Sequence, residues 1–394
     1  MSARQSRGAC PSLSEPMETG DGLLVRLSPA SRKISPHQLA GIAEAAARHG
    51  NGLLEVTRRG NLQIRGLDTM SAKLFAAEVP ALDIEIASGV PVETGPLAGI
   101  DASEIADPRP LADAIRARTQ KLAAQLGPKV SVTIDGGGVL HLGAVLADVK
   151  LTAIGGGWQV AIGGDAASAR TIGTMDATRA VDTALHVLTL LATRGRTARA
   201  RDLGRDGTSE FANLRPGGGD SVQPSPVGQF ALRGGTTAQG FALAFGQIDS
   251  VDLSKFASAL NGRNSVHFAP GGGLMVTGLS TTAAAALCEF AERLGLVTRP
   301  DDPRLSITAC AGGPACGSAW IATRQIAADL AAGGRPVQPI HLSGCAKGCA
   351  RPAAPMVTLT GTSQGAAIEG AATPDLHAAL TALGHRHFIQ RETA

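Results

Sequence analysis

Residues 20–67 read GDGLLVRLSPASRKISPHQLAGIAEAAARHGNGLLEVTRRGNLQIRGL, and residues 239–279 read QGFALAFGQIDSVDLSKFASALNGRNSVHFAPGGGLMVTGL. The second stretch is a degenerate version of the first. Because the two lie about half a chain length apart, they indicate an internal duplication and a protein with pseudo-twofold symmetry, not a solenoid with its shorter period.

Both stretches predict the same elements: a strand, a turn, a helix, and two short strands around a glycine-rich turn. Apolar residues at helical spacing mark the helix, which in the first stretch are Leu39, Ile42, Ala43 and Ala46. The ends of the stretches lie 212 residues apart, whereas Gly22 and Gly240 at their starts lie 218 apart. We therefore expect an additional loop of six residues in the first stretch.

A larger segment of mixed strands and helices follows each stretch. The first segment contains strand-like residues 129–134 and a predicted helix over 177–193. The second contains a predicted helix over 318–332 between strand-like residues. Residues 214–229, which lie between the two halves, are rich in Gly, Pro and Ser and are expected to form a linker.

Composition excludes several classes of protein. The formal net charge is +3, and the 394 residues include no Tyr and two Trp, so neither a strong positive field nor aromatic platforms favour nucleic-acid binding. The longest apolar run, residues 184–192, is too short to span a bilayer. Arg4 and Arg7 are not followed by the apolar segment of a signal peptide. We expect a cytoplasmic protein without a membrane or nucleic-acid partner.

Four cysteines form two pairs near the end of the chain. Five residues separate Cys310 from Cys316, three separate Cys345 from Cys349, and 28 lie between the pairs. Thiolates bind soft metals, either zinc or an iron–sulfur cluster. Zinc knuckles favour about two to four intervening residues. A spacing of five followed by three therefore favours one [4Fe–4S] cluster, whose corners lie further apart.

The neighbouring residues agree with a cluster. Four glycines would let backbone amides approach its sulfides, namely Gly312, Gly313, Gly344 and Gly348. We expect Cys316 at the start of the following helix, where the helix dipole favours negative sulfur. The alternative is four structural thiols that pair in sequence by chance. Cys288 lies in a helical pattern and is expected in the core, and Cys10 is expected to be a free thiol.

These features resemble the nitrite/sulfite reductase superfamily, whose members combine duplicated halves with a C-x₅-C and C-x₃-C cluster beside a tetrapyrrole. The resemblance implies an α+β fold with two ferredoxin-like repeats, each followed by a larger α/β domain. The implied units are residues 1–75 (first repeat), 76–213 (first α/β domain), 214–229 (linker), 230–295 (second repeat) and 296–394 (cluster domain). The family motif T-x-R-x-x-x-Q, here TRRGNLQ, implies that Arg59 and Gln63 face the tetrapyrrole.

Two catalytic features of the sulfite reductases are missing. Residues 90–95 contain no arginine where those enzymes have one, and Lys129 stands alone where they have a Lys-x-Lys pair. Reduction of sulfite or nitrite needs several cations to bind the anion and supply protons. In siroheme enzymes the last cluster cysteine, here Cys349, anchors the siroheme. A siroheme-dependent reductase is therefore the alternative interpretation, and a non-catalytic electron carrier or a zinc-stabilised binding protein are others.

A closer resemblance is to the precorrin-3B synthase family of aerobic cobalamin biosynthesis, carried by RGACPSL, METGDGLLVRL, TRRGNLQIRGL, GPLAGID and SGCAKGCARP. The resemblance implies that the tetrapyrrole is the substrate. Precorrin-3A would be hydroxylated with O₂ at C20, with closure of a γ-lactone. It also implies one [4Fe–4S] cluster, one mononuclear non-haem iron, and an external electron donor such as NADH, used directly or through a redox partner.

A substrate rich in acetate and propionate groups calls for guanidinium and ammonium partners. The candidates for substrate binding are Arg58, Arg59 and Lys129, with Gln63 as a neutral partner and with Arg26 and Arg65 nearby in sequence. A second arginine-rich group, residues 194–205, reads either as a solvated face or as part of a carboxylate pocket. The histidines His141, His267 and His341 form no facial-triad pattern, so no ligand of the mononuclear iron is assigned.

Overall fold

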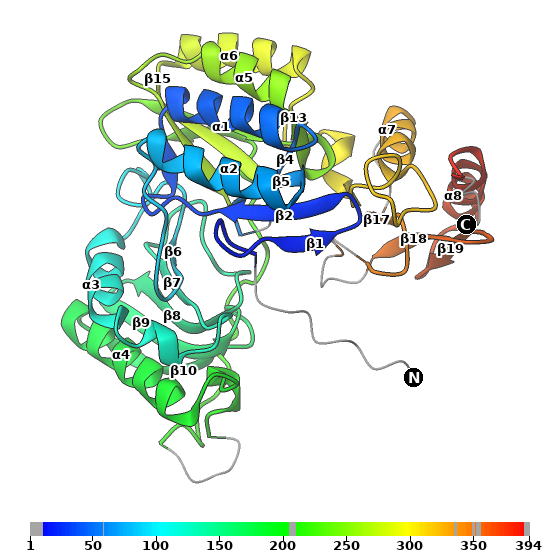
Figure 1. The fold of residues 1–394 in the computed structure, drawn as a ribbon. Coiled ribbons are helices and arrows are strands. Elements are labelled where there is room, and N and C mark those ends of the chain that lie inside the picture. The colour runs from blue at the N-terminus through cyan, green and yellow to red at the C-terminus, as the bar shows by residue number, and fades with distance from the viewer. Residues whose placement is uncertain are drawn as a thin grey trace.

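The computed structural model describes residues 11–57, 59–204, 210–334, 336, 338–348, 351 and 356–389. Of the predicted functional residues, Arg58 and Cys349 lie outside this set, as does Cys10. The described chain forms two intertwined repeat units, a first α/β domain below them, and a C-terminal domain to one side (Figure 1).

The two repeat units contain matching elements in matching order. The first unit comprises β1 (Met17–Thr19), β2 (Gly22–Leu27), β3 (Lys33–Ile34), α1 (Pro36–His49), β4 (Leu53–Val56), β5 (Leu62–Leu67) and α2 (Thr69–Ala81). The second comprises β11 (Gly228–Ala231), β12 (Thr237–Ala242), β13 (Gln247–Asp249), α5 (Ser250–Ser258), β14 (Ser265–Ala269), β15 (Gly273–Leu279) and α6 (Thr281–Arg293). This match confirms the predicted duplication.

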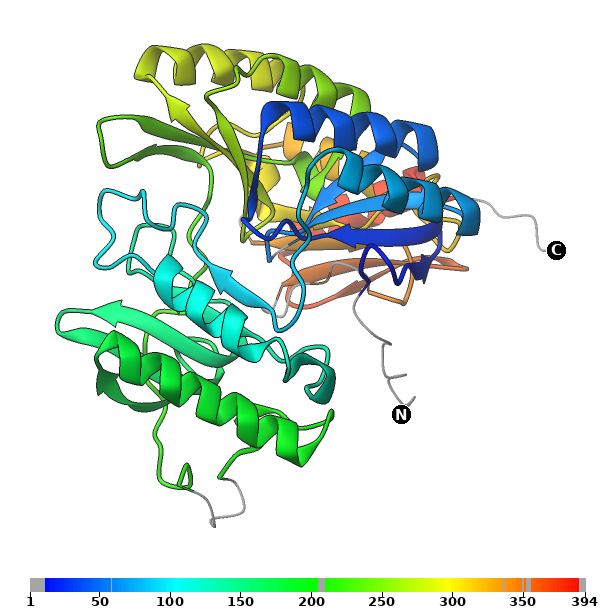
Figure 2. The same cartoon turned by 60° about the vertical axis from the view of Figure 1, so that its left-hand side comes forward.

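The units exchange a strand with one another. The first sheet has the order β1-β2-β5-β4-β13, and the second has the order β11-β12-β15-β14-β3. Helices α1 and α5 pack side by side (Figures 1 and 2), and the buried apolar residues of both units form one core. Within this core Phe241 and Phe256 meet edge to face, with ring centroids 5.3 Å apart. Neither repeat is therefore an independent folding unit.

Helix α1 illustrates how the sequence determines these elements. Ser35 caps its first turn in a capping box with Gln38, and Pro36 occupies the first helical turn, where no intrahelical N–H bond is lost. The predicted apolar positions, Leu39, Ile42, Ala43 and Ala46, are all buried.

The predicted six-residue loop in the first copy is wrong. Val25 on β2 pairs with Ile64 on β5, and the equivalent pair in the second unit is Gln239 on β12 with Val276 on β15. Equivalent residues of β2 and β12 therefore lie 214 residues apart in the sequence, and those of β5 and β15 lie 212 apart. The glycines used for the sequence match, Gly22 and Gly240, are not equivalent. Helix α1 has 14 residues and α5 has nine, so the copies differ in helix length and connections instead.

The first α/β domain contains one five-stranded sheet covered on one face by two helices (Figure 2). Its elements are β6 (Val92–Thr94), α3 (Arg109–Thr119), β7 (Val132–Asp135), β8 (Ala147–Ile154), β9 (Gly157–Gly164), β10 (Arg170–Met175) and α4 (Ala177–Arg194). Strands β6, β7 and β8 are parallel, whereas β9 and β10 continue the sheet in antiparallel fashion. Helix α4 agrees closely with the helix predicted over 177–193.

The C-terminal domain repeats this topology with one strand fewer. It contains β16 (Ile307–Ala309), α7 (Thr323–Ala332), β17 (Ile340–Ser343), β18 (Val357–Thr362), β19 (Gly365–Glu369) and α8 (Pro374–Arg386). Strands β16, β17 and β18 are parallel, and β19 is antiparallel to β18. Helix α7 starts at Thr323, five residues later than predicted. The short 3₁₀ helices η1 to η4 cover Ala123–Gln125, Ala200–Asp202, Ala244–Gly246 and Pro303–Ser306.

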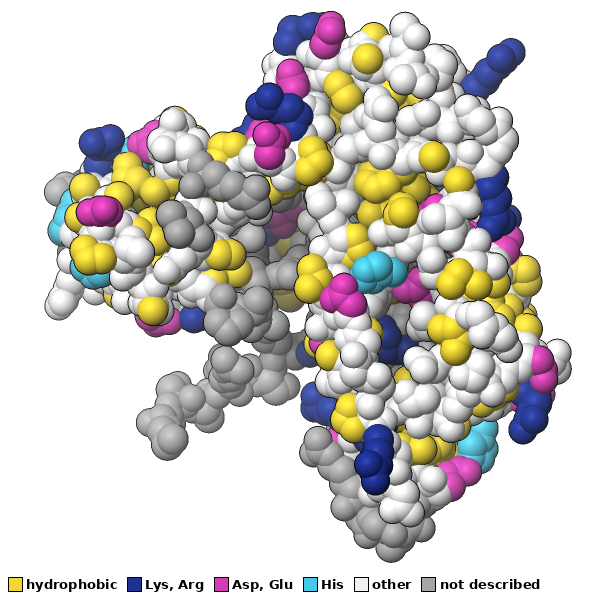
Figure 3. All heavy atoms as spheres, turned by 180° about the vertical axis from the view of Figure 1, so that it is seen from behind, with side chains coloured by type: hydrophobic (Ala, Val, Ile, Leu, Met, Phe, Trp, Pro, Cys, Tyr) yellow, Lys and Arg dark blue, Asp and Glu magenta, His cyan; other side chains and the backbone are white. Residues whose placement is uncertain are grey.

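The elements show where the expected unit boundaries fall. Residue 75 lies inside α2, and residue 229 lies inside β11. Residues 76, 213, 214, 295 and 296 fall on α2 or on connecting segments. The described helices include none that is long and apolar enough to cross a membrane. From behind, the C-terminal domain projects from the body, and Lys and Arg side chains are scattered over this face (Figure 3).

We expect Phe256→Ala to destabilise both units together, because its fully buried ring lies in their common core. Phe-to-Ala changes in cores typically lower the free energy of unfolding by about 3–5 kcal/mol. Urea unfolding followed by circular dichroism measures the change. Leu74→Ala is the control, because Leu74 is exposed on α2 and should change this free energy by less than about 0.5 kcal/mol. Equal effects of the two substitutions would contradict a shared core.

Candidate functional site

The two cysteine pairs follow neighbouring parallel strands. Cys310 comes directly after β16, and Cys345 comes two residues after β17. The strands pair in register, with Ala309 opposite Leu342. Because the carboxyl ends of parallel strands meet at one edge of a sheet, the chain brings the starts of both cysteine loops to the same edge. We call this edge the cysteine edge.

Backbone hydrogen bonds join the two loops. The N–H of Cys310 donates to the Leu342 carbonyl over 3.0 Å, and the N–H of Gly344 donates to Cys310 Sγ over 3.1 Å. The N–H of Trp320 donates to the Gly344 carbonyl over 2.7 Å. A backbone amide that donates to a cysteine sulfur stabilises the thiolate form. The predicted approach of glycine amides to cluster sulfides stays a prediction.

The prediction that Cys316 starts a helix is wrong. Helix α7 begins seven residues later, and Cys316 lies in a turn where its N–H donates to the Gly312 carbonyl over 2.7 Å. Cys310 is the cysteine next to the helix start instead, because the Thr323 hydroxyl donates to its carbonyl over 2.8 Å. Residues 317–322 lie between Cys316 and the helix and form backbone hydrogen bonds to Gly20 of the first unit and to Gly344 after β17.

A turn of the first unit closes over the cysteine edge. The N–H of Gly317 donates to the Gly20 carbonyl over 2.7 Å, and a Cβ on Gly20 would collide with Cys316 Sγ. A Cβ on Gly344 would likewise press on the Ala319 side chain, and one on Gly312 would collide with Thr323. The backbone at Gly20 thus approaches the Cys316 sulfur as closely as only glycine allows, and Gly312 and Gly344 permit tight packing of the two cysteine loops.

The Gly20 turn is held by a buried ion pair. Arg65 Nε and Nη2 donate to the two carboxylate oxygens of Asp21 over 2.8 and 2.6 Å, and Nη1 donates to Glu55 over 3.3 Å. Burial alone would lower the pKa of Arg65, but the hydrogen bonds and the attraction from Asp21 and Glu55 outweigh burial and raise this pKa. Burial alone would raise the pKa of Asp21, but Arg65 holds it below its usual value. Arg65, a substrate-binding candidate from the sequence, is thus engaged in this pair.

The described part of the chain does not form a complete metal site at the cysteine edge. Among the described residues, no group of three or more His, Cys, Asp or Glu side chains could hold a metal ion. The fourth predicted ligand, Cys349, lies outside those residues. Cys288 is half-buried on α6, away from the edge, and burial raises the pKa of its thiol.

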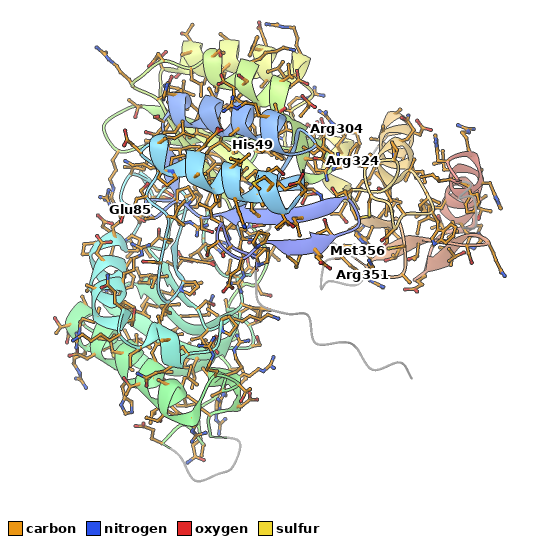
Figure 4. The ribbon with its side chains drawn as sticks, viewed as in Figure 1. His49, Glu85, Arg304, Arg324, Arg351 and Met356 are labelled. Atoms are coloured by element: carbon orange, nitrogen blue, oxygen red, sulfur yellow. The ribbon has the colours of Figure 1, made fainter. Side chains whose placement is uncertain are left out.

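A large basic cavity lies between the first unit and the first α/β domain. Its volume is about 1230 Å³, and the described residues lining it include eight Lys or Arg and three Asp or Glu. The cations are Arg26, Arg32, Arg59, Arg116, Lys129, Arg170, Arg199 and Arg201. The acids are Glu85 (labelled in Figure 4), Glu93 and Asp148. This excess of cations makes the cavity electrostatically suited to a ligand with several negative charges.

The Arg59 turn has a defined local structure. Gly60 adopts a positive φ of 69°, its N–H donates to the Thr57 carbonyl over 2.8 Å, and the Thr57 hydroxyl accepts from the N–H of Asn61. Arg32 supports the turn from the next loop, with Nη2 donating to the Arg59 carbonyl over 2.6 Å. Arg32 itself has a positive φ of 55°, an unusual conformation for a non-glycine residue.

Arg59 reaches across the cavity to the α/β domain. Its Nη1 donates to Glu93 over 3.1 Å, and its Nη2 donates to the Leu146 carbonyl over 2.7 Å. Glu93 is buried, and its second oxygen has no hydrogen-bond partner among the described residues. The buried Nε atoms of Arg26 and Arg32 likewise have no hydrogen-bond partner among the described residues. Buried polar atoms are costly without partners, so their clustering here indicates that a ligand or water satisfies them.

The predicted substrate-binding residues separate into two groups. Arg59, Lys129 and Arg26 line the cavity. Gln63 lies on β5 directly opposite Arg26 in register, but it is not among the lining residues. Arg58 lies outside the described residues.

Sequence reasoning missed several cavity residues. For Arg199 and Arg201, the sequence left a solvated face and a carboxylate pocket as alternatives; both line the cavity, and Arg199 pairs with Asp148 over 2.9 Å. Arg32 and Arg116 gave no signal, because isolated arginines carry none until the fold brings them together. Burial lowers the pKa of Arg32.

The three histidines considered for iron lie apart and are engaged locally. His341 is fully buried, and its Nδ1 lies 2.9 Å from the Thr308 hydroxyl. His267 lies 3.2 Å from the Thr277 hydroxyl. Burial lowers the pKa of both to about 4, so both rings are neutral. His141 Nδ1 accepts from the Gly143 N–H.

Strand β2 links the cavity and the cysteine edge. The turn before it, at Gly20, contacts Cys316, and Arg26 near its end lines the cavity. Arg26 lies four residue steps along the strand from Gly22, which corresponds to roughly 13 Å. The basic cavity and the cysteine edge therefore lie near opposite ends of one strand.

Comparisons with known proteins agree with this architecture. A family model described as the nitrite/sulfite reductase ferredoxin-like half domain matches residues 15–78. A precorrin-3B synthase from Sinorhizobium sp is 39% identical over 378 residues, which cover 92% of this chain and 82% of the relative. The solved structure of the Mycobacterium tuberculosis NirA protein superposes with a TM-score of 0.66 over 88% of this chain and 74% of that protein. At 19% identity, this last likeness shows the fold alone, and it confirms the predicted duplicated reductase-like architecture.

We expect Gly20→Ala to disturb the cysteine edge, because the new methyl group would collide with Cys316 Sγ. The iron and sulfide content of the reconstituted protein should fall, while the unfolding midpoint in urea changes little. Gly155→Ala is the control, because a Cβ there meets nothing within 4 Å and Gly155 does not line the cavity. Full iron loading of Gly20→Ala would show that the turn does not cradle the site.

Proposed function

The chain belongs to the precorrin-3B synthase family, and we propose that it converts precorrin-3A to precorrin-3B with molecular oxygen. One oxygen atom enters the substrate as the C20 hydroxyl group, and a ring-A acetate closes the γ-lactone. The other oxygen atom leaves as water, and an external donor such as NADH supplies the two electrons. The observation that carries the proposal is the 39% identity to a precorrin-3B synthase over 92% of the chain.

The basic cavity supports this proposal as the binding site for the macrocycle. Precorrin-3A carries acetate and propionate carboxylates around a ring, and forked guanidinium groups bind such carboxylates in bidentate fashion. Arg26 and Arg59 would meet carboxylates from the side of the first unit, and Lys129 and Arg201 from the side of the α/β domain. A volume of about 1230 Å³ exceeds the usual upper range of small-molecule sites, which agrees with a substrate of this size.

Arg59 has a particular part in this proposal. In the structure its guanidinium is held by Glu93 and by the Leu146 carbonyl. A substrate carboxylate would compete with Glu93 for the same donor. Glu93 thus keeps Arg59 extended across the cavity and limits the cost of its charge before the substrate binds.

We further propose that Cys310, Cys316, Cys345 and Cys349 hold one [4Fe–4S] cluster. Support comes from the parallel strands that bring both loops to one edge, the Gly344 amide on Cys310 Sγ, and the Gly20 cradle. When bound, the cluster and a mononuclear iron would supply the single-electron chemistry that triplet O₂ requires. The protein's own residues bind the carboxylates, fix the ring orientation and exclude water. The ligands of the mononuclear iron are not assigned.

Incubation of the reconstituted protein with precorrin-3A tests the function. Under air and NADH, mass spectrometry should detect a product with one added oxygen atom, and ¹⁸O₂ should label it. Under nitrogen no such product should form. Cys345→Ser should lose both the iron–sulfur absorption and the product. Oxygen incorporation from water, or a siroheme spectrum with sulfite or nitrite turnover, would refute the proposal in favour of a reductase.

Arg59→Ala should weaken binding of precorrin-3A by about 10- to 100-fold, the range expected for loss of a charge-assisted hydrogen bond worth roughly 1.5–3 kcal/mol. Equilibrium binding under nitrogen measures the Kd without turnover. Arg118→Ala is the matched control, since Arg118 pairs with Asp182 on the exposed surface and does not line the cavity. An unchanged Kd for Arg59→Ala would move the substrate to another site.

A further inference from the structure

A half-buried arginine lies next to the cysteine edge. Arg324 is the second residue of α7, directly after Thr323, whose hydroxyl bonds to the Cys310 carbonyl. The side chain turns toward the repeat units, where its Nη2 donates to the Phe245 carbonyl over 3.3 Å. Figure 4 shows Arg324 between α7 and the edge of the first sheet.

The charge of Arg324 is not neutralised by the described part of the chain. Its Nε is buried and has no hydrogen-bond partner there, and no described carboxylate forms an ion pair with it. Glu55 is the acid that attracts it, but Glu55 already accepts hydrogen bonds from Arg65 and Gln247. Burial lowers the pKa of Arg324 to about 10, so it remains a cation at neutral pH.

A partly buried cation without a counter-charge is costly, and such a group persists where another anion compensates it. The sulfur of Cys310 is the other negative group whose attraction acts on Arg324. Four thiolates around an iron–sulfur cluster would concentrate negative charge at this edge. A reduced cluster carries one more negative charge than an oxidised one, so a fixed cation nearby favours the reduced state and raises the reduction potential.

We propose that Arg324 is a positioning residue for electron transfer, which holds a fixed positive charge beside the cluster thiolates and raises the reduction potential of the cluster. This inference rests on the cluster of the proposed function. Arg65, which donates to Glu55 and Asp21, holds the Gly20 turn, so the first unit contributes the cradle and α7 contributes the charge at the cysteine edge.

The test is a redox titration of the reconstituted full-length protein, monitored by visible absorption and by electron paramagnetic resonance. Arg324→Met keeps a long side chain but removes the charge, and Arg324→Lys keeps the charge. We expect the Met variant to retain its iron and sulfide but to show a more negative midpoint potential. The Lys variant should return most of the way to the wild-type value.

Arg386→Met is the control, because Arg386 is exposed on α8 and lies 3.8 Å from Asp329; its midpoint potential should equal that of the wild type. Equal potentials for wild type and Arg324→Met would overturn the role of Arg324 and leave the proposed function intact. If the Met variant does not load a cluster, Arg324→Gln is compared with Arg324→Lys, and equal potentials would again overturn it. A wild-type protein that binds no cluster would overturn both proposals.

Discussion

The reciprocal exchange of β3 and β13 is the constraint on which the rest of the structure depends. Each sheet of the repeat units is completed by a strand of the other, so the two cores merge into one. This merging fixes the first sheet relative to the second half of the chain, which carries the cysteines. The contact between Gly20 and Cys316 requires that fixed relation, because it joins segments separated by almost 300 residues. A loosely tethered repeat could not hold a glycine backbone against a sulfur.

The two ends of β2 contact different regions of the protein. At its start β2 closes the cysteine edge, and near its end it presents Arg26 to the cavity. The two regions have opposite electrostatic requirements, since thiolates need nearby donors and cations whereas the cavity must offer cations to a ligand. Asp21 and Glu55 engage Arg65 at one end, and Glu93 engages Arg59 in the cavity. Acidic residues therefore position the arginines before any ligand binds.

Much of this arrangement could be predicted from local sequence signals. Helix α1 follows from the spacing of Leu39, Ile42, Ala43 and Ala46, and the duplication follows from the similarity of the two stretches. The strand pairing could not be predicted from Gly22 and Gly240, because glycines recur at many turns and only the hydrogen-bonded register shows which residues are equivalent.

Residues whose roles depend on burial in the folded chain could not be identified from the sequence. Arg32 and Arg324 are isolated arginines in unremarkable segments, and their importance lies in buried Nε atoms that only the folded chain creates. Arg65 shows the converse error: its neighbours in sequence suggested a substrate contact, whereas the fold gives it Asp21. The start of α7 was placed too early because residues 318–322 have helical composition but make contacts with Gly344 and His387 that a helix would not allow.

The duplication places a comparable parallel edge in each α/β domain, but only the C-terminal edge carries cysteines. The first α/β domain has the same parallel edge, at the ends of β6 and β7. There, however, carboxylates accept the backbone N–H groups of the loops. Asp135 accepts from the N–H groups of Gly137 and Leu142, and Glu104 accepts from that of Gly99. Burial raises the pKa of Glu104 to about 7, as expected for an acid enclosed by backbone. In the first α/β domain the backbone donors bond to carboxylates, whereas in the C-terminal domain the Gly344 N–H donates to the Cys310 sulfur. Of the two edges, only the C-terminal one carries cysteine sulfur, the donor that soft metals prefer.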